Sequence, residues 1–215
     1  MEIPDGLLQT YLENHCEPEP EVLQKIAHET HLKVLRPHMI SGHYQGRLLS
    51  FFSKLLQPKA ILEIGTFTGY ATICLAEGLA ENGEIDTIEV NPELEDLLRK
   101  NFLASGFVEK IKLHIGEAFN IFSLLSHKMY DIAFIDADKR NNYKYYELIF
   151  DNIRPGGLIL VDNILRKGKI LDNNHQENDI RLLREFNDKI TVDARVENLI
   201  LPIRDGLMII RKKQL

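Results

Sequence analysis

The chain has 215 residues, of which 44% are hydrophobic, and a formal net charge of −6. This length lies within the range of one domain, and the apolar content is enough to build a substantial core, which excludes wholesale disorder. The 26 basic residues are scattered rather than clustered, so we expect no nucleic-acid partner.

The N-terminus and the cysteines both indicate an intracellular protein. Residues 1–16 lack a basic start followed by an apolar stretch, so we expect no signal peptide. No apolar run approaches the ~20 residues that a membrane span requires. The two cysteines, Cys16 and Cys74, have neither metal-binding nor redox spacing. We therefore predict a cytoplasmic protein without a membrane partner.

Residues 1–57 are predicted to form a helical extension and cap. Helices are expected over three segments: 7–14, 21–35 and 46–56. The last of these has apolar residues at helical spacing, which places four of them on one side: Leu48, Phe51, Phe52 and Leu55. The intervening segment 36–46 is expected to be a loop or a helix entry.

After Pro58 the sequence alternates between short apolar, β-branched runs and helical segments. The runs predicted to be strands are 60–65, 84–90, 110–116, 130–136 and 156–162, and the helical segments between them are 68–80, 91–106, 117–126 and 141–153. Such alternation is typical of a parallel sheet covered on both faces. The continuous apolar character of the strands agrees with burial on both sides.

The C-terminal part departs from this rhythm. It is predicted to contain a polar loop, a helix and two strands, at 163–175, 176–190, 194–203 and 205–213. The short connection near Arg204 implies an antiparallel hairpin, because a parallel pair needs a long crossover. We therefore expect a single α/β domain, in which 58–215 is the core and 1–57 the extension.

Three predicted strand ends suggest a cofactor site. The first runs into a glycine-containing turn over 63–70 and then a helix, where the backbone can approach a ligand and N–H groups are free. The second ends at Glu89, whose carboxylate can bind a ribose diol. The third ends at 114–118, which is equally consistent with a plain turn. Each feature alone also fits a structural role, but together they favour an adenosine-type ligand. The GxxxG spacing lacks the first close pair of the dinucleotide fingerprint.

Polar side chains also end the fourth and fifth predicted strands. Asp136 follows one, and Asp162 and Asn163 end the other. Neighbouring parallel strands lie ~5 Å apart, so these oxygens would converge and the two carboxylates would repel unless a cation lay between them. Oxygen ligands without His or Cys indicate Mg²⁺ or a similar ion. The alternative is that Asp162 and Asn163 only form a turn.

Six stretches carry a family resemblance: LEIGTFTGYA, IDTIEVNPE, GEAF, YDIAFIDADKRNNYKYYE, RPGGLILVDNIL and LPIRDGLMIIRK. In this order the sequence resembles the cation-dependent S-adenosylmethionine O-methyltransferases, which include catechol and caffeoyl-CoA O-methyltransferases. The resemblance covers about residues 39–212. The resemblance implies a Rossmann-like class I methyltransferase fold with seven mostly parallel strands, the last antiparallel, and helices on both faces. It also implies a homodimer, and methyl transfer from S-adenosyl-L-methionine to a hydroxyl of a catechol-like acceptor, either free or CoA-linked.

The same resemblance implies roles for individual residues. Asp136, Asp162 and Asn163 would hold the divalent cation, with Mg²⁺ expected ahead of Mn²⁺ or Ca²⁺. Lys139 lies where catechol-type members place their base, so Lys139 and Asp136 are the predicted catalytic pair. The predicted cofactor residues are Met39, Ser41, Glu63, Gly65, Phe67, Ala71, Glu89, Glu117, Ala118, Asp136 and Asp138.

One position departs from the family pattern. Many members have a serine after the Gly-Tyr pair, where it bonds the cofactor carboxylate, whereas this chain has Ala71. Neighbouring backbone amides or Thr72 are the expected substitutes. Two other functions remain open: an NAD(P)-dependent oxidoreductase on a related fold, and a non-catalytic S-adenosylmethionine-binding module. A cofactor-binding assay distinguishes the first, and an assay for methyl transfer distinguishes the second.

Overall fold

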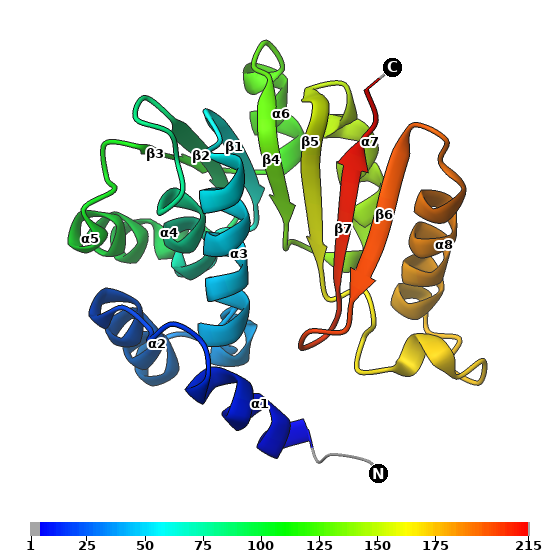
Figure 1. The fold of residues 1–215 in the computed structure, drawn as a ribbon, viewed down its shortest axis with the longest axis horizontal. Helices are drawn as coiled ribbons and strands as arrows, with labels where there is room; N and C mark the ends of the chain where they lie inside the picture. Colours follow the sequence, from blue (N-terminus) through cyan, green and yellow to red (C-terminus); the bar gives the residue numbers. More distant parts are fainter. Residues whose placement is uncertain (1–4, 215) are drawn as a thin grey trace.

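The seven strands form one sheet in the order β3-β2-β1-β4-β5-β7-β6, in a computed structural model that describes residues 5–214 (Figure 1). The strands are β1 (Ala60–Ile64), β2 (Glu84–Glu89), β3 (Ile111–Ile115), β4 (Tyr130–Ile135), β5 (Ile153–Asp162), β6 (Val196–Leu201) and β7 (Leu207–Lys212). Adjacent strands from β1 to β5 pair in parallel, and β7 is antiparallel to both β5 and β6. The predicted mostly parallel sheet with an antiparallel last strand is confirmed.

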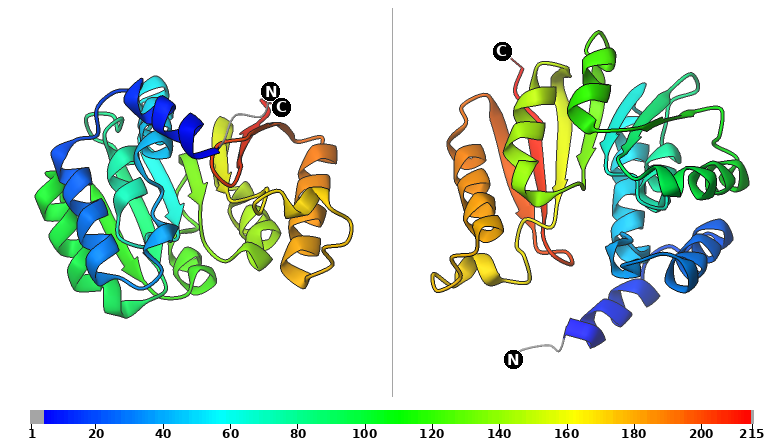
Figure 2. Two further views of the ribbon diagram at one scale, coloured as in Figure 1. Left: turned by 90° about the horizontal axis from the view of Figure 1, so that it is seen from below. Right: turned by 180° about the vertical axis from the view of Figure 1, so that it is seen from behind.

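Helices cover both faces of this sheet. They are α1 (Asp5–Asn14), α2 (Glu21–Lys33), α3 (His43–Leu56), α4 (Tyr70–Ala76), α5 (Glu95–Ser105), α6 (Ala118–Leu125), α7 (Asn142–Phe150) and α8 (Asn178–Val192), with 3₁₀ turns η1 (Pro37–Met39), η2 (Pro92–Leu94), η3 (Lys139–Asn141) and η4 (Lys169–Leu171). One buried cluster joins the sheet to α2–α5, and the other joins it to α6–α8 (Figure 2). Burial on both faces explains why all six residues of β4 are buried.

The apolar stripe predicted within 46–56 is only partly buried. Leu48 and Phe52 pack against the buried cluster that joins the sheet to α2–α5, whereas Phe51 and Leu55 are 60% and 67% exposed. The helix also packs on α4 through small residues: a Cβ added to Gly46 would lie 2.6 Å from the Tyr70 ring, and Ser53 Oγ donates to the Leu75 carbonyl at 2.6 Å. Apolar periodicity found this helix but did not indicate these close contacts.

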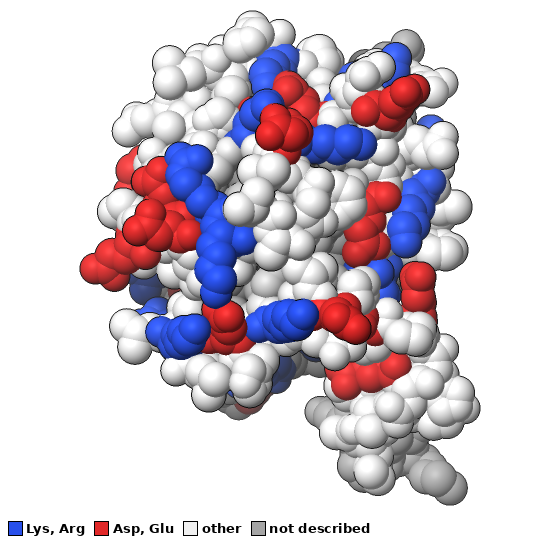
Figure 3. All heavy atoms as spheres, turned by 90° about the vertical axis from the view of Figure 1, so that its left-hand side faces the viewer, with Lys and Arg blue, Asp and Glu red and all other residues white. Residues whose placement is uncertain are grey.

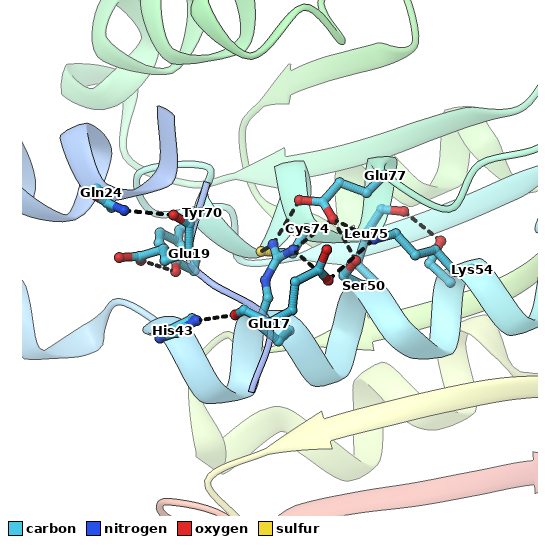
Figure 4. Close-up of polar contacts among 12 residues, drawn as sticks. Glu17, Glu19, Gln24, His43, Ser50, Lys54, Tyr70, Cys74, Leu75 and Glu77 are labelled. Atoms are coloured by element: carbon cyan, nitrogen blue, oxygen red, sulfur yellow. Dashed lines mark hydrogen bonds and ion pairs between the residues drawn. The ribbon is translucent and has the colours of Figure 1, made fainter. Parts of the chain in front are cut away.

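A polar cluster fastens α3 to α4 (Figure 4). The side chain of Arg47, only 7% exposed, donates to both carboxylate oxygens of Glu77, at 2.9 and 2.7 Å, and Ser50 Oγ donates to the same group at 2.6 Å. Burial acts to raise the pKa of Glu77, but these hydrogen bonds lower it overall. Tyr70 at the start of α4 donates to Glu19, which anchors the segment before α2. The N-terminal extension is thus tied to the helix that follows the β1 turn.

Acidic and basic side chains are intermixed on the face that α2 and α5 contribute to (Figure 3). Lys100 of α5 pairs with Glu29 of α2 at 2.8 Å, and Arg99 pairs with Glu95 at 2.6 Å. Such exposed pairs contribute little to stability. Among the helices of residues 5–214, none combines the length and the apolar character that crossing a membrane requires.

Candidate active site

A pocket lies where the order of the parallel strands reverses, between β1 and β4, the usual ligand position in such sheets. It is lined by Met39, Ile40, Ser41, Gly65, Thr66, Phe67, Thr68, Tyr70, Ala71 and Asp136. Six of the eleven predicted cofactor residues are in this lining: Met39, Ser41, Gly65, Phe67, Ala71 and Asp136. They come from three places in the chain, namely the segment before α3, the β1–α4 turn and the end of β4.

Gly65 brings two of these places into contact. Its φ is +98°, and a Cβ added to it would lie 2.3 Å from the backbone carbonyl oxygen of Asp136. The Asp136 N–H in turn donates to the Ile64 carbonyl at 2.9 Å. Only glycine permits this backbone conformation together with so close an approach. The β1 turn and the end of β4 therefore form one rigid wall of the pocket.

Glu89, at the end of β2, holds the turn from the other side. One carboxylate oxygen accepts the Phe67 N–H at 2.7 Å and the other accepts the Asn91 N–H at 2.8 Å. Each oxygen keeps a second lone pair, so the carboxylate can still accept hydrogen bonds from a diol. The carboxylate thus lies beside the turn with acceptor capacity left on both oxygens.

Glu63 is fully buried behind the turn. One of its oxygens accepts the hydroxyls of Thr72 and Thr87, both at 2.5 Å, and Oε1 has no hydrogen-bond partner within the part of the chain that the structure describes. Burial raises the pKa of Glu63 to about 8, so the group is mostly protonated at neutral pH. The Thr72 hydroxyl donates to Glu63 here, and the expected substitutes for the missing serine, Thr72 or the neighbouring backbone amides, stay predictions.

Replacing Glu63 by glutamine is expected to flatten the pH dependence of stability. The pKa is near 4.5 in the unfolded chain and about 8 in the folded one, so ionisation penalises the folded state as pH rises from 4.5 through 8. The penalty at high pH is about 5 kcal/mol. Urea unfolding at pH 6 and pH 9 should show a smaller loss for Glu63→Gln than for the wild type. The control is Glu93→Gln, at an exposed position. If both variants lost the same free energy of unfolding between pH 6 and pH 9, ionisation of the buried Glu63 would not be the cause.

The oxygen-bearing residues predicted from the ends of β4 and β5 lie together. Ile135 pairs with Val161, which places Asp136 beside Asp162 at the same edge of the sheet. Asp162 is 1% exposed, and its pKa is raised to about 6 by burial and by the charge of Asp136. Lys139 Nζ lies 2.7 Å from Asp136 Oδ1 and offsets part of that repulsion.

This donor set fits a divalent cation. Two carboxylates that are close enough to repel, one of them buried, are stabilised by a positive ion between them. Asn163 follows directly with φ +60°, a left-handed conformation that asparagine tolerates, and its N–H donates to Asp162 Oδ1 at 2.8 Å. Within residues 5–214 no group of three or more His, Cys, Asp or Glu is arranged for a metal.

The remaining predicted residues lie outside the pocket lining. Asp138 is exposed and accepts the Tyr145 hydroxyl at 2.7 Å, while Glu117 is exposed at the start of α6 and Ala118 is buried in the core. His114, on the third strand, bonds Asp86 at 2.8 Å on the neighbouring strand. The roles of Asp138, Glu117 and Ala118 toward a cofactor stay predictions.

Gln45 is a buried residue of this site that the sequence did not reveal. It is 0% exposed and lies near the Asp162 carboxylate, and its Nε2 has no hydrogen-bond partner among the residues that the structure describes. The residue lies in a polar stretch, HYQG, at the start of α3. Neither its neighbours nor its spacing from Asp162 signals the contact.

Comparisons with known proteins agree with this geometry. The profile of a protein family described as O-methyltransferase matches residues 13–213. A catechol O-methyltransferase of Niastella koreensis is 36% identical over 160 residues, covering 73% of this chain and 72% of its own. A probable caffeoyl-CoA O-methyltransferase of Dictyostelium discoideum is 32% identical over 207 residues, covering 94% and 90%. The O-methyltransferase of Bacillus cereus, solved with SAH, superposes with a TM-score of 0.88 at 27% identity, covering 96% and 97%.

Proposed function

The chain belongs to the O-methyltransferase family, and from that premise we propose that it transfers a methyl group from S-adenosylmethionine to a hydroxyl of a catechol-like aromatic acceptor with the help of a divalent cation. The observation that carries the proposal is the position of Asp136. This residue lines the pocket of the β1–α4 turn and also lies beside Asp162 in the oxygen cluster. A cofactor site and a cation site that share one residue bring a methyl donor and a metal-held acceptor together.

The cofactor assignment is supported by relatives and by the wall of the pocket. The Bacillus cereus protein was solved with SAH, and TomG of Streptomyces achromogenes, 26% identical with a TM-score of 0.89, was solved with SAM. In this chain Glu89 would bind the ribose hydroxyls, since both of its oxygens are already oriented by backbone N–H groups. Met39 and Ser41 would cover the sulfonium end. S-adenosylmethionine supplies an electrophilic methyl group to an attacking oxygen.

Asp136, Asp162 and Asn163 would hold the cation. When bound there, a Mg²⁺-type ion supplies Lewis-acid stabilisation to a phenolate and orients two adjacent hydroxyls. The residues around the site would contribute positioning and proton transfer: Lys139 Nζ lies 2.7 Å from Asp136 Oδ1, and in its neutral form it would accept a proton from an acceptor hydroxyl at this position. A phenol with a pKa of ~10 needs such help at neutral pH.

Replacing Lys139 by methionine is expected to lower kcat by about 10²–10⁴-fold, the usual contribution of a general base. Cofactor affinity should change little, because Lys139 does not line the pocket. Cation affinity should stay equal or rise, because the positive charge beside Asp136 is lost. Steady-state kinetics measure kcat, and calorimetry measures the cofactor and cation affinities. The control is Lys144→Met, which changes an exposed lysine on α7. A kcat as high as that of the control would remove Lys139 from the reaction.

The proposed function is tested by a methylation screen with catechol, caffeate, caffeoyl-CoA and flavonoids, with Mg²⁺ or with excess chelator. We expect a methylated product from at least one acceptor, and only when the cation is present. Cofactor binding without any methylation would favour a non-catalytic module. Methylation at full rate in chelator would refute the cation.

The homodimer implied by the family resemblance stays a prediction. The exposed apolar residues Phe51 and Leu55 on α3 are the kind of surface that a second subunit covers. Sedimentation equilibrium decides it, and a single species at the 24.8 kDa mass of the chain would count against a dimer.

A further inference from the structure

The turn between β6 and β7 reaches across to the segment that covers the cofactor pocket. Arg204 Nη1 donates to the Ser41 carbonyl and, at 3.4 Å, to Gln45 Oε1, while Nη2 donates to the His38 carbonyl at 3.4 Å. We call residues 38–45 the cap segment, since Met39, Ile40 and Ser41 line the pocket. One guanidinium group therefore holds three points of the cap segment. Figure 1 shows this turn at the end of the sheet where β4 and β5 finish.

The backbone of Arg204 adopts a conformation that glycine favours. Its φ is +49°, in the left-handed region that favours glycine over a long side chain. A glycine would adopt this turn without strain. The arginine instead bonds the cap segment, which is 159 to 166 positions away in the sequence.

The other side of the same turn holds the segment that follows the proposed cation ligands. The Gly206 carbonyl accepts the Ile164 N–H at 3.1 Å, and the Asp205 carbonyl accepts the Leu165 N–H at 2.8 Å. Asp162 itself pairs with Leu207, the first residue of β7. The turn is thus bonded to the cap segment on one side and to the ligand segment 162–165 on the other.

Gln45 lies between the two. It accepts from Arg204 through Oε1 at 3.4 Å, and its side chain is fully buried, with no hydrogen-bond partner for Nε2 among the residues that the structure describes. The bond from Arg204 therefore fixes the only polar atom of this side chain that is paired within residues 5–214.

We propose that Arg204 is a positioning residue, which fixes the cap segment over the cofactor pocket at a defined position relative to the cation ligands. It thereby couples the binding of the cofactor to the binding of the cation. The coupling between cofactor and cation binding rests on the proposed function, whereas the fixing of the cap segment by Arg204 does not. If the guanidinium only stabilised the turn between β6 and β7, removing it would change neither the cofactor affinity nor the mobility of the cap segment.

The first test uses Arg204→Gly, which removes the guanidinium and suits the left-handed backbone, so the fold is retained. Calorimetry with S-adenosylhomocysteine should show about tenfold weaker binding, the size expected for losing a charge-assisted hydrogen bond. Hydrogen exchange at the amides of Met39 and Ile40, which bond within η1, should be about tenfold faster. The matched control is Arg211→Gln, an exposed arginine of β7 paired with Glu197 at 3.1 Å, and it should leave both quantities unchanged.

Arg204→Lys gives the conservative comparison. A lysine keeps the charge but cannot bond several carbonyls in a fixed plane, so its cofactor affinity should lie between those of the wild type and Arg204→Gly. Unchanged affinity and unchanged exchange in Arg204→Gly would overturn the proposal.

The coupling is measured with Mn²⁺ as the probe, by electron paramagnetic resonance and by calorimetry at zero and saturating Mn²⁺. In the wild type, Mn²⁺ should tighten S-adenosylhomocysteine binding, and in Arg204→Gly this ratio should fall toward one. An equal ratio in both proteins would overturn the coupling. If the wild type does not bind Mn²⁺, the proposed cation site fails, and the affinity and exchange measurements still decide the positioning role of Arg204.

Discussion

Replacing Asp162 by asparagine is expected to abolish cation-dependent methyl transfer, with a loss in kcat of at least ~10³-fold, while the fold and the cofactor pocket persist. The cation site would lose one of only two carboxylates, and the Lewis-acid contribution that depends on it amounts to several kcal/mol in the transition state. The pocket should persist because Asp162 is not part of its lining. An asparagine can also still accept the Asn163 N–H that Asp162 accepts at 2.8 Å.

The same substitution should not lower stability when no cation is present. Burial and the neighbouring Asp136 raise the pKa of Asp162 to about 6, so ionisation of this group disfavours the folded state as pH rises from the ordinary range of aspartate through 6. A neutral asparagine removes that cost above pH 6. Thermal unfolding at pH 7.5 in chelator should therefore give Asp162→Asn a melting temperature equal to or above that of the wild type.

The measurements are kcat over a Mg²⁺ titration, S-adenosylhomocysteine affinity by calorimetry, and thermal unfolding. Asp151→Asn, which changes an exposed aspartate after α7, serves as the control for removing one negative charge. A variant at position 162 that keeps more than a tenth of the wild-type rate, with the same Mg²⁺ dependence, would exclude Asp162 as a ligand.

Replacing Gly65 by alanine is expected to cost at least ~3 kcal/mol in the free energy of unfolding and to weaken cofactor binding by more than about 100-fold. The added Cβ would lie 2.3 Å from the carbonyl oxygen of Asp136 and 2.7 Å from its carbonyl carbon. Both are backbone atoms, so a rotamer change cannot relieve the clash. Separating the β1 turn from the end of β4 would displace a wall of the pocket and one cation ligand together.

Gly106→Ala provides the matched control. Gly106 also has a positive φ, +78°, but a Cβ there would meet nothing within 4 Å. That variant therefore measures the conformational cost of alanine in the left-handed region, which is ~1 kcal/mol. Urea unfolding of both variants separates conformation from close approach. Equal losses at the two positions would contradict the steric role of Gly65.

Much of the fold could be predicted because the strands are apolar on both sides. Runs such as the one that ends at Asp136 are recognisable without knowing their neighbours, and the turn near Arg204 is too short for a parallel crossover. The meeting of Asp136 and Asp162 followed from the assumption that the fourth and fifth strands are neighbours, which the pairing of Ile135 with Val161 confirms.

The rest depends on contacts that leave no local pattern. The close contact of α3 with α4 involves small residues such as Gly46 and Ser53, and hydrophobic periodicity does not register them. Thr72 looked free in the sequence, but the buried carboxylate of Glu63 takes its hydroxyl. The bond from Arg204 to Gln45 joins positions 159 residues apart, so no spacing rule finds it.

The order of the last strands has a consequence for how the molecule is assembled. β7 is the final strand of the chain, yet it lies between β5 and β6. During synthesis β6 therefore leaves the ribosome before β7, its one partner in the sheet that residues 5–214 form, exists, and the edge of β5 remains open until β7 arrives. Closure of this side must be among the last folding events, because it waits for a long-range pairing. In the interval the apolar edge of β5 is exposed to other chains, which makes the nascent protein most prone to aggregation just before its site is completed.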